Sequence, residues 1–419
     1  MKQNISILVF FLSLLSFSQN KEIGSAFIQT LLVEKNYEKA YSHFDETIKG
    51  QISMPMLEQT INQLESQLGK FKSVIEVNDN DGVYYYYSEF EKMKLDVKIA
   101  FRDSDKIAGF FFAPHKHFDK GNSLGKEYSI TSNGIELKGT LLIPDENNLK
   151  KMVILIHGSG PQDRDETIGE NKPFKDIAES LYHKGIASYR FDKRTYSNPE
   201  SFTDKSTIDD EVAVDALNII AFFKNNPDFK SYEITVIGHS LGGYMLPRIA
   251  NKTTQISKIV LLAGNARSLD LLISEQYDYL YGSDSSEEAK KEVAKVKEQI
   301  SYLNSAAFNS ESPKEKLPLN IPAAYWKSLL VYKPLTEIQK VKTPILILQG
   351  ERDYQVTMTD FNLWKKTLQK NKKAKFISYP SLNHLFMSGT GKPNPEEYTV
   401  KSNVSTDVIN DIFNFIVSK

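Results

Sequence analysis

Cysteine is absent from all 419 residues of the chain. This absence excludes disulfide bonds, thiolate metal sites, a cysteine nucleophile and a lipid attached through an N-terminal cysteine. A nucleophile used in covalent catalysis would therefore have to be an oxygen or a nitrogen atom.

An excess of charge of one sign is also missing, because 52 Lys and Arg residues face 53 Asp and Glu residues. Such a chain has no global field that could concentrate a polyanion, so we expect a small-molecule partner and no nucleic acid. Hydrophobic residues make up 40% and charged residues 25% of the chain, ordinary values that argue against disorder and against a multi-span membrane protein. The sequence holds no His/Asp cluster and no phosphate-binding Gly-rich loop, so we expect neither a metal nor a cofactor.

Long apolar runs are missing except at the N-terminus. The run from Ile5 to Phe17 follows a lysine, is interrupted only by serines and gives way to polar residues at Gln19. This layout is typical of a signal peptide and is too short to span a bilayer comfortably. Ser16 and Ser18 supply small residues for a signal peptidase, so we expect residues 1–18 to be removed and the folded protein to be exported, to the periplasm or the extracellular space. An uncleaved anchor is the alternative.

Residues 22–115 are expected to form a small α+β domain. Apolar residues recur at helical spacing as far as Leu68, and after Gly69 three segments rich in aromatic and β-branched residues predict strands. These segments are 83–90, 93–101 and 107–113. The polar stretch 115–126, which contains two glycines, predicts a linker.

Residues 127–419 are expected to form an α/β domain. A hairpin is predicted over 128–143, and short apolar runs then alternate with helical segments such as 208–223. The runs are 152–156, 186–191, 234–237, 259–262, 345–348 and 376–379. Near-continuous apolar runs of this length indicate strands buried on both faces, and helices between them imply parallel crossovers, so the pattern predicts a doubly wound fold. The interval from about 268 to 341 breaks the alternation with a charged amphipathic helix and an aromatic cluster, which predicts an inserted helical cap.

The strongest chemical signal is the pattern Gly-x-Ser-x-Gly at 238–242, which follows a predicted strand and precedes a helical segment. Glycines are needed there because Ser240 would sit on a sharp, strained turn where bulkier neighbours would collide. The turn exposes the serine Oγ above the sheet, and the N-terminus of the following helix favours developing negative charge. A Gly-rich turn without chemistry is the alternative.

In this context the motif resembles the nucleophile elbow of the α/β-hydrolases, and the resemblance extends over about 127–419. It implies a serine hydrolase whose acid and histidine follow the nucleophile in the chain. His384 is the one histidine after the nucleophile and is the expected base. The segment Gly-x-x-Asp-x-x-Val at 350–356 looks like the acid loop of these enzymes and puts Asp353 in the acid position, with Glu351 as a lesser candidate.

The resemblance also implies an oxyanion hole made of two backbone amides. One would come from Leu241, the residue after the nucleophile. The segment 157–160 is similar to the His-Gly loops of lipases and esterases, so Ser159 is the expected second donor, with Gly158 and Gly160 as alternatives.

Continued to Asp165, this segment looks like that of a bacterial carboxylesterase group related to serine aminopeptidase-like hydrolases. We expect His157 and the nearby charged residues to fix loops rather than to contact substrate; the charged residues are Asp163, Arg164, Asp192 and Arg194. The first domain resembles, without a sharp motif, small α+β domains of unknown function found ahead of bacterial secreted hydrolases. We infer no chemistry for it.

The residues and the resemblance together predict a serine esterase that cleaves short-chain carboxylic esters through an acyl-Ser240 intermediate. Cap aromatics would cover the acyl chain if they face inward; these are Tyr277, Tyr281, Tyr325 and Trp326. The first alternative is a serine aminopeptidase-like peptidase, which would need a carboxylate for the substrate ammonium group. The acidic candidates in the cap are Asp270, Glu275 and Asp278. An inactive hydrolase fold that serves as a binding module is the second alternative.

Overall fold

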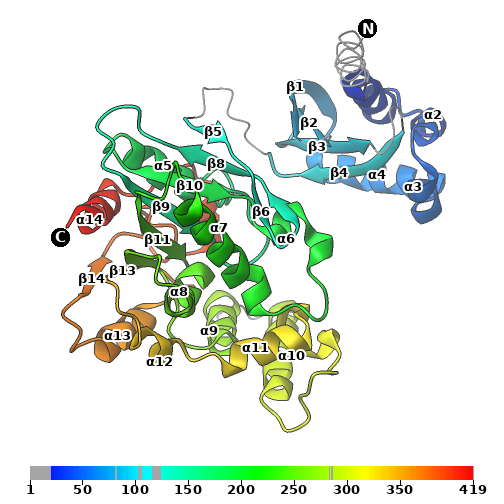
Figure 1. Cartoon of the computed structure of the whole chain (residues 1–419). Coiled ribbons are helices and arrows are strands. Elements are labelled where there is room, and N and C mark those ends of the chain that lie inside the picture. Colours follow the sequence, from blue (N-terminus) through cyan, green and yellow to red (C-terminus); the bar gives the residue numbers. More distant parts are fainter. Residues whose placement is uncertain are drawn as a thin grey trace. The chain divides into compact units, whose positions relative to one another are not determined.

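The chain divides into two compact units, Met1–Asn122 and Ser123–Lys419, which are described here one at a time (Figure 1). The computed structural model describes residues 20–80, 83–101, 106–115, 124–282, 284 and 286–418. The predicted signal peptide and most of the predicted linker lie outside these residues. Within them, no helix is long and apolar enough to cross a membrane.

The first unit pairs helices with a four-stranded antiparallel sheet of order β1-β2-β3-β4. Its elements are η1 (Gln29–Val33), α2 (Tyr37–Ser42), α3 (Glu46–Gln51), α4 (Met54–Leu68), β1 (Phe71–Asn80), β2 (Val83–Phe90), β3 (Lys94–Phe101) and β4 (Ile107–Ala113). Helix α4 begins after Ser53, whose side chain caps the amide of Met56, and ends at Gly69, whose φ of 76° a larger residue would adopt only with strain. The α+β architecture predicted for this part of the chain is confirmed.

Strand β1 is the one strand of this sheet that the sequence pattern misses. It pairs with β2 at the edge of the sheet, and none of its described side chains is buried. An edge strand that is only partly buried against the core does not need the continuous apolar residues by which a buried strand is recognised. Its sequence, Phe-Lys-Ser-Val-Ile-Glu-Val-Asn-Asp-Asn, is accordingly rich in polar residues.

The second unit is built on an eight-stranded sheet of order β14-β13-β12-β11-β9-β10-β8-β5. Its strands are β5 (Lys126–Glu127), β8 (Gly139–Leu142), β9 (Lys151–Ile156), β10 (Ala187–Phe191), β11 (Glu233–His239), β12 (Lys258–Leu262), β13 (Ile345–Gly350) and β14 (Ala374–Tyr379). The strands β9 to β14 pair in parallel and account for all six predicted apolar runs, one of which begins at Ile186, one residue before β10. The predicted hairpin is partly wrong, because only β6 (Ile130–Ser132) and β7 (Ile135–Leu137) form it, while β8 joins the main sheet.

Helices cover both faces of this sheet, as the near-continuous apolar runs require. In β9, Met152 and Ile154 pack in the cluster that contains α7 and α8, whereas Val153 and Leu155 pack in the cluster that contains α5 and α14. The helices of the two layers and the short turns between them are α5 (Pro173–Tyr182), α6 (Arg194–Ser197), η2 (Pro199–Ser201), η3 (Asp209–Ala213), α7 (Val214–Asn225), α8 (Leu241–Lys252), α13 (Met358–Thr367), η6 (Pro395–Thr399) and α14 (Thr406–Val417). The doubly wound α/β fold is confirmed.

The predicted helical cap is also confirmed, because the described residues between β12 and β13 form helices and no strand of the sheet. The cap consists of α9 (Leu269–Tyr281), α10 (Glu287–Leu303), η4 (Lys314–Lys316), η5 (Pro318–Asn320), α11 (Ala323–Val331) and α12 (Pro334–Ile338). Tyr325 and Trp326 are buried in α11, whereas Tyr281 is 39% exposed. The cap aromatics therefore do not all share one environment.

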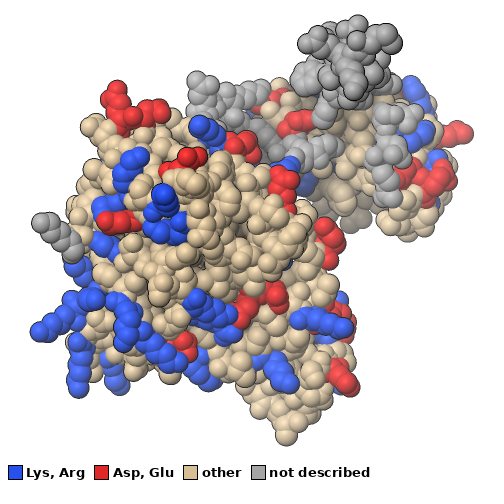
Figure 2. Space-filling view, in the orientation of Figure 1, with Lys and Arg blue, Asp and Glu red and all other residues tan. Residues whose placement is uncertain are grey.

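Surface charge is unevenly spread over the second unit although the chain is nearly neutral. Figure 2 shows lysine and arginine side chains gathered over the region of α12, α13 and β14. The lysines of this segment are Lys365, Lys366, Lys370, Lys372, Lys373 and Lys375. Two of them, Lys365 and Lys366, lie in the last turn of α13, where positive charge opposes the negative end of the helix dipole.

Candidate active site

Ser240 lies on the turn between β11 and α8 with φ 50° and ψ −115°, a backbone conformation that few residues other than glycine adopt. The glycines of the motif make this turn possible. A Cβ added at Gly238 would lie 2.5 Å from the carbonyl carbon of Gly242, and one added at Gly242 would lie 2.3 Å from the carbonyl oxygen of Ile156. Ser240 also lines a cavity. The turn between β11 and α8 therefore places this serine in the accessible wall of that cavity.

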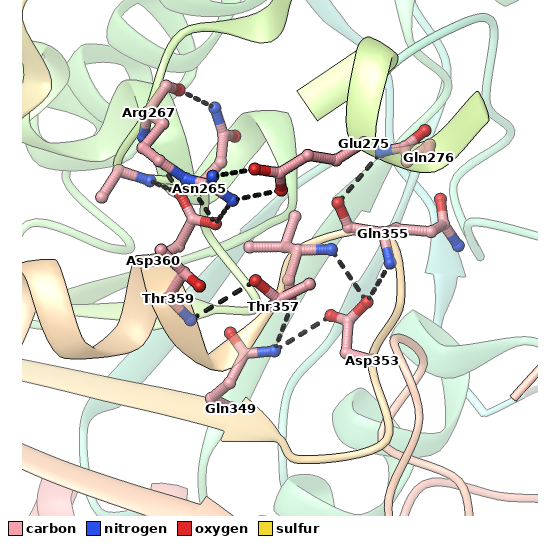
Figure 3. Close-up of polar contacts among 12 residues, drawn as sticks. Asn265, Arg267, Glu275, Gln276, Gln349, Asp353, Gln355, Thr357, Thr359 and Asp360 are labelled. Carbon is pink, nitrogen blue, oxygen red and sulfur yellow. Dashed lines mark hydrogen bonds and ion pairs between the residues drawn. The ribbon is translucent and has the colours of Figure 1, made fainter. Parts of the chain in front are cut away.

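Asp353 and His384 meet on the loops that follow β13 and β14. His384 Nδ1 lies 2.6 Å from Asp353 Oδ2, and both side chains are buried. Asp353 Oδ1 accepts from the amides of Gln355 and Val356 over 2.8 and 2.9 Å, and Gln349 Nε2 donates to Oδ2 over 3.0 Å (Figure 3). These donors fix the carboxylate, which in turn holds the Nδ1–H of His384 and leaves its Nε2 for another partner.

Glu351, the lesser candidate for the acid, is exposed and accepts a hydrogen bond from Ser378 Oγ over 2.7 Å. The structure therefore brings Asp353, and not Glu351, to His384. Sequence reasoning missed Gln349, which is 1% exposed and holds Asp353. The signal was a polar residue within the otherwise apolar strand Ile-Leu-Ile-Leu-Gln-Gly.

Leu241 and Ser159, the residues expected to supply the oxyanion amides, lie at the same cavity as Ser240. Ser159, Ser240 and Leu241 line the same cavity, and no acceptor for either amide is found within the described ranges. Gly158 is different, because its amide donates to Glu166 Oε1 over 2.6 Å. Of the alternatives for the second oxyanion donor, Gly158 is thus already engaged, while Ser159 and Gly160 remain at the cavity wall.

The cavity next to Ser240 has a volume of about 480 Å³. Its wall is mainly apolar and comes from the loop after β9, the start of α8, and the cap. Of the four cap aromatics named above, only Tyr325 is among its lining residues. Tyr325 therefore meets the condition that the side chain faces inward, whereas Trp326 packs in the core and Tyr281 faces solvent.

A buried pair, Glu166 with His239, connects the loop of Ser159 with His384. Glu166 Oε2 lies 3.0 Å from His239 Nδ1, out of line for a hydrogen bond, and His239 Nε2 lies 2.9 Å from the carbonyl oxygen of His384. Burial opposes protonation of His239, but the Glu166 carboxylate and the His384 carbonyl outweigh it and raise its pKa. Burial likewise acts to raise the pKa of Glu166, but the facing imidazole lowers it on balance. Both shifts act in the direction that favours the ion pair.

A second buried pair, Lys193 with Glu211, contacts the same loop. Lys193 Nζ donates to the carbonyl oxygens of Gly158 and Gly160 and to Glu211, and Glu211 accepts from the Tyr325 hydroxyl. Sequence reasoning missed Glu166, Lys193 and Glu211, because their neighbours in the sequence do not distinguish them from charged residues on the surface.

Other charged residues near the loop fix its shape, as predicted. Arg164 Nη2 donates to Asp192 over 2.8 Å, Arg194 pairs with Asp215, and Asp163 accepts from Thr167. His157 packs between aromatic rings, and burial lowers its pKa to about 4, so its imidazole is neutral and structural. None of the residues named for this role, which are His157, Asp163, Arg164, Asp192 and Arg194, lines the cavity.

The acidic cap residues that an aminopeptidase could use have other partners. Glu275 pairs with Arg267, Asp278 pairs with Lys297, and Asn304 donates to Asp270. Figure 3 shows Glu275 turned to Arg267, while its neighbour Gln276 donates to the carbonyl of Gln355 and so joins α9 to the acid loop. In the described part of the chain, no group of three His, Cys, Asp or Glu residues could hold a metal ion.

Comparisons with known proteins find matches in both units of the chain. Residues 25–110 match a family described as a protein of unknown function (DUF3887), and residues 315–415 match the dienelactone hydrolase family. Among solved structures, Est1E from Butyrivibrio proteoclasticus is 18% identical with a TM-score of 0.45, over 70% of this chain and 100% of Est1E. The Pyrococcus furiosus esterase Pf2001 is 17% identical with a TM-score of 0.44, over 70% of this chain and 90% of its own.

Esterase EstD from Thermotoga maritima is 32% identical to this chain over 417 residues, which are 97% of this chain and 98% of EstD. The match therefore includes the first unit as well as the hydrolase unit. The predicted resemblance to serine hydrolases is confirmed, and the chain belongs to the α/β-hydrolase esterase family that includes EstD.

Proposed function

We propose that this protein hydrolyses carboxylic esters with a short acyl group, through an acyl-Ser240 intermediate. The observation that carries the proposal is the buried contact between His384 Nδ1 and Asp353. Their loops follow β14 and β13, and the strained turn of Ser240 follows β11, so all three lie at the carboxyl ends of parallel strands. The full-length match to EstD, which is named an esterase, supports the same reaction class.

In the proposed mechanism, His384 Nε2 takes the proton of Ser240 as the hydroxyl attacks the ester carbonyl, and later gives it to the leaving alcohol. Asp353 keeps the imidazole in the tautomer that has a free Nε2 and stabilises the imidazolium that forms. The amides of Leu241 and Ser159 would bind the negative charge on the tetrahedral intermediate. Water then hydrolyses the acyl-serine with the same base.

The cavity favours an ester over an amino-terminal peptide. Glu211 is the one carboxylate among its lining residues, and it is already engaged by Lys193 and Tyr325. A peptidase of the aminopeptidase kind needs a free carboxylate for the substrate ammonium group and tight placement of the poor leaving amine. The apolar wall and the volume of about 480 Å³ suit a small acyl group.

The experiment compares kcat/KM for alkyl acetate, butyrate and decanoate esters with kcat/KM for aminoacyl and dipeptide anilides of similar size. We expect the two short esters to be cleaved fastest. Activated nitrophenyl esters react with almost any nucleophilic serine, so unactivated alkyl esters decide the result. Anilides that match or exceed them would contradict the esterase proposal and support the peptidase.

An inactive binding module is tested with a fluorophosphonate probe, which labels only an activated serine. We expect labelling of the protein that disappears in Ser240→Ala. No labelling of the folded wild-type chain would support the binding module instead.

We also propose export with removal of residues 1–18, on the strength of the apolar run between Ile5 and Phe17. Mass spectrometry of the protein from its native host should find an N-terminus near Gln19. An intact Met1 on cytoplasmic material would contradict export.

A further inference from the structure

The loop that carries Ser159 is held by two buried side chains of opposite charge. Lys193, 3% exposed, reaches it from one side, with Nζ 2.7 Å from the carbonyl oxygen of Gly158 and 3.0 Å from that of Gly160. Glu166, 1% exposed, accepts the amide of Gly158 from another side. Both polar groups of Gly158 are therefore occupied, and Ser159 lies between the two carbonyls that Lys193 binds.

The contact with Gly158 determines where the amide of Ser159 points. The carbonyl of Gly158 and the N–H of Ser159 belong to one planar trans peptide unit, in which the two bonds point in opposite directions. Because the carbonyl is directed at Lys193, the N–H of Ser159 is directed away from it. Ser159 lines the cavity beside Ser240, so this orientation presents the amide as a donor to the site.

The same lysine is joined to the cap. Glu211 binds Lys193 with one carboxylate oxygen and accepts the hydroxyl of Tyr325 with the other. Tyr325 belongs to α11, and both Glu211 and Tyr325 line the cavity. Burial and the neighbouring carboxylate raise the pKa of Tyr325 well above its usual value, so its hydroxyl stays protonated and remains a donor.

We propose that Lys193 is a positioning residue that orients the Ser159 amide of the oxyanion hole, and that the Glu211–Tyr325 contact links this orientation to the cap. The proposal rests on the proposed function. Lys193 touches no reacting atom in this role, and it acts through the peptide unit between Gly158 and Ser159. Loss of Lys193 would let that unit rotate, so the transition state would lose a donor while binding of the ground-state ester would change little.

The test compares Lys193→Met with Lys258→Met in the full chain. Lys258 is a matched control because it is also buried and its Nζ donates to the backbone carbonyls of Phe415 and Ile416, over 2.8 and 3.1 Å. It lies at the start of β12, away from the cavity. Active sites are counted with a fluorophosphonate, so that kcat refers to folded enzyme.

For Lys193→Met we expect kcat on an alkyl butyrate to fall by about 10- to 100-fold, with KM changed by less than about threefold. The Ki of a trifluoromethyl ketone of the same acyl size should rise by the same factor. In this inhibitor Ser240 Oγ bonds to the carbonyl carbon, its proton passes to His384, and the carbonyl oxygen becomes an oxyanion in the hole. Lys258→Met should lower the melting temperature but change neither kcat nor Ki.

Because Lys193→Met leaves the charge of Glu211 buried without its partner, Lys193→Met/Glu211→Gln is the second variant. It removes both charges with little change of volume, and the same changes in kcat and Ki are expected. A folded double variant with wild-type kcat and Ki would overturn the proposal.

The link to the cap is tested with Tyr325→Phe. Its control is Tyr379→Phe, which removes a comparable hydroxyl that donates to Asp411 over 2.8 Å and does not line the cavity. We expect kcat to fall by about three- to tenfold in Tyr325→Phe and to stay unchanged in Tyr379→Phe. The loss in Tyr325→Phe should be smaller than that in Lys193→Met, because Glu211 still binds Lys193. Equal kcat in the two variants would overturn the link.

The wild-type protein separates failure of this inference from failure of the proposed function. If wild type cleaves no ester and binds no fluorophosphonate, the proposed function fails. If wild type is active and the Lys193 variants match it, the inference alone fails.

Discussion

The two units of the chain differ most in what they bury. In the described part of the first unit, the buried polar side chains are Thr30, Ser88 and Asp96, while its core is apolar and aromatic. The second unit buries both members of several pairs of titratable side chains, which are Glu166 with His239, Lys193 with Glu211, Arg194 with Asp215, and Asp353 with His384.

This difference is informative because buried charge is costly. Removing an ion from water costs several kcal/mol, and only a close partner with further hydrogen bonds offsets that cost. Three of the four pairs contact either the loop of Ser159 or His384. Paired titratable side chains are thus buried where loops converge on the cavity, whereas Asp96, the buried carboxylate of the first unit, faces the partly exposed His115.

The largest effect should come from the nucleophile. Ser240→Ala should reduce kcat for an unactivated ester by about 10⁴-fold or more, and Ser240→Ala/His384→Ala should lose little further, because the two residues act as one unit. Steady-state kinetics of the single and double variants measure this. If the two losses multiply in the double variant, Ser240 and His384 act independently. The buried Asp353–His384 pair would then have no part in activating Ser240, and the contrast between the two units would lose its functional meaning.

The next effect should come from the acid. Asp353→Asn should keep the fold but lower kcat by about 10²- to 10⁴-fold, because an amide at this position no longer selects the tautomer of His384 with a free Nε2. Glu351→Gln, at an exposed carboxylate in the same loop, is the control and should stay within about threefold of wild type. A larger loss in the control would show that the acid is misassigned.

A smaller effect on turnover, with a clear effect on stability, is expected for Glu166→Gln. The pKa of His239 is higher in the folded protein than in the unfolded chain, where it is 6.5. The contribution of His239 to stability is therefore fully present below pH 6.5 and is lost as the pH rises through the pKa of the folded state. The pKa of Glu166 is lowered, so its contribution persists above 4.5 and is lost as the pH falls through the folded value. The pair therefore stabilises most between about pH 4.5 and 6.5.

The melting temperature of Glu166→Gln should accordingly lie about 5 to 10 °C below that of wild type at pH 5.5, with a smaller gap at pH 8.5. Calorimetry at the two pH values measures both gaps. A gap that is independent of pH would mean that His239 is neutral in the folded protein.

The smallest effect on turnover is expected for the first unit. Phe44→Ala should cost about 3 to 5 kcal/mol in the free energy of unfolding, because Phe44 is buried against Phe27 and Phe110. The exposed Phe111 supplies the control, Phe111→Ala. Thermal unfolding should show that Phe44→Ala is destabilised, and steady-state kinetics should show that its kcat is unchanged. A loss of kcat as large as that of Asp353→Asn would give the first unit a part in catalysis and remove the contrast between the units.

Much of the fold could be predicted because its signals are local. Each parallel strand is a short apolar run between turns, and a strand buried on both faces needs such a run whatever its neighbours are. Strand β1 escaped prediction because an edge strand carries no such requirement. Which of the cap aromatics face the cavity stayed open at the level of the sequence, because helical spacing does not say which helix face meets the cavity; the structure places Tyr325 there.

The sequence by itself determined the order of Ser240, Asp353 and His384, because the glycines around the serine and the Gly-x-x-Asp-x-x-Val segment encode their turns within a few residues. Only the tertiary structure decided that Asp353 rather than Glu351 meets His384, and that Glu166 and Lys193 hold the loop of Ser159.

These contacts join residues that are far apart in the chain. Lys193 lies 35 positions from Gly158, and Tyr325 lies 114 positions from Glu211. The neighbours of a charged residue in the sequence cannot show whether folding will bury it beside a partner or leave it in water, and that difference decides whether it acts in the site.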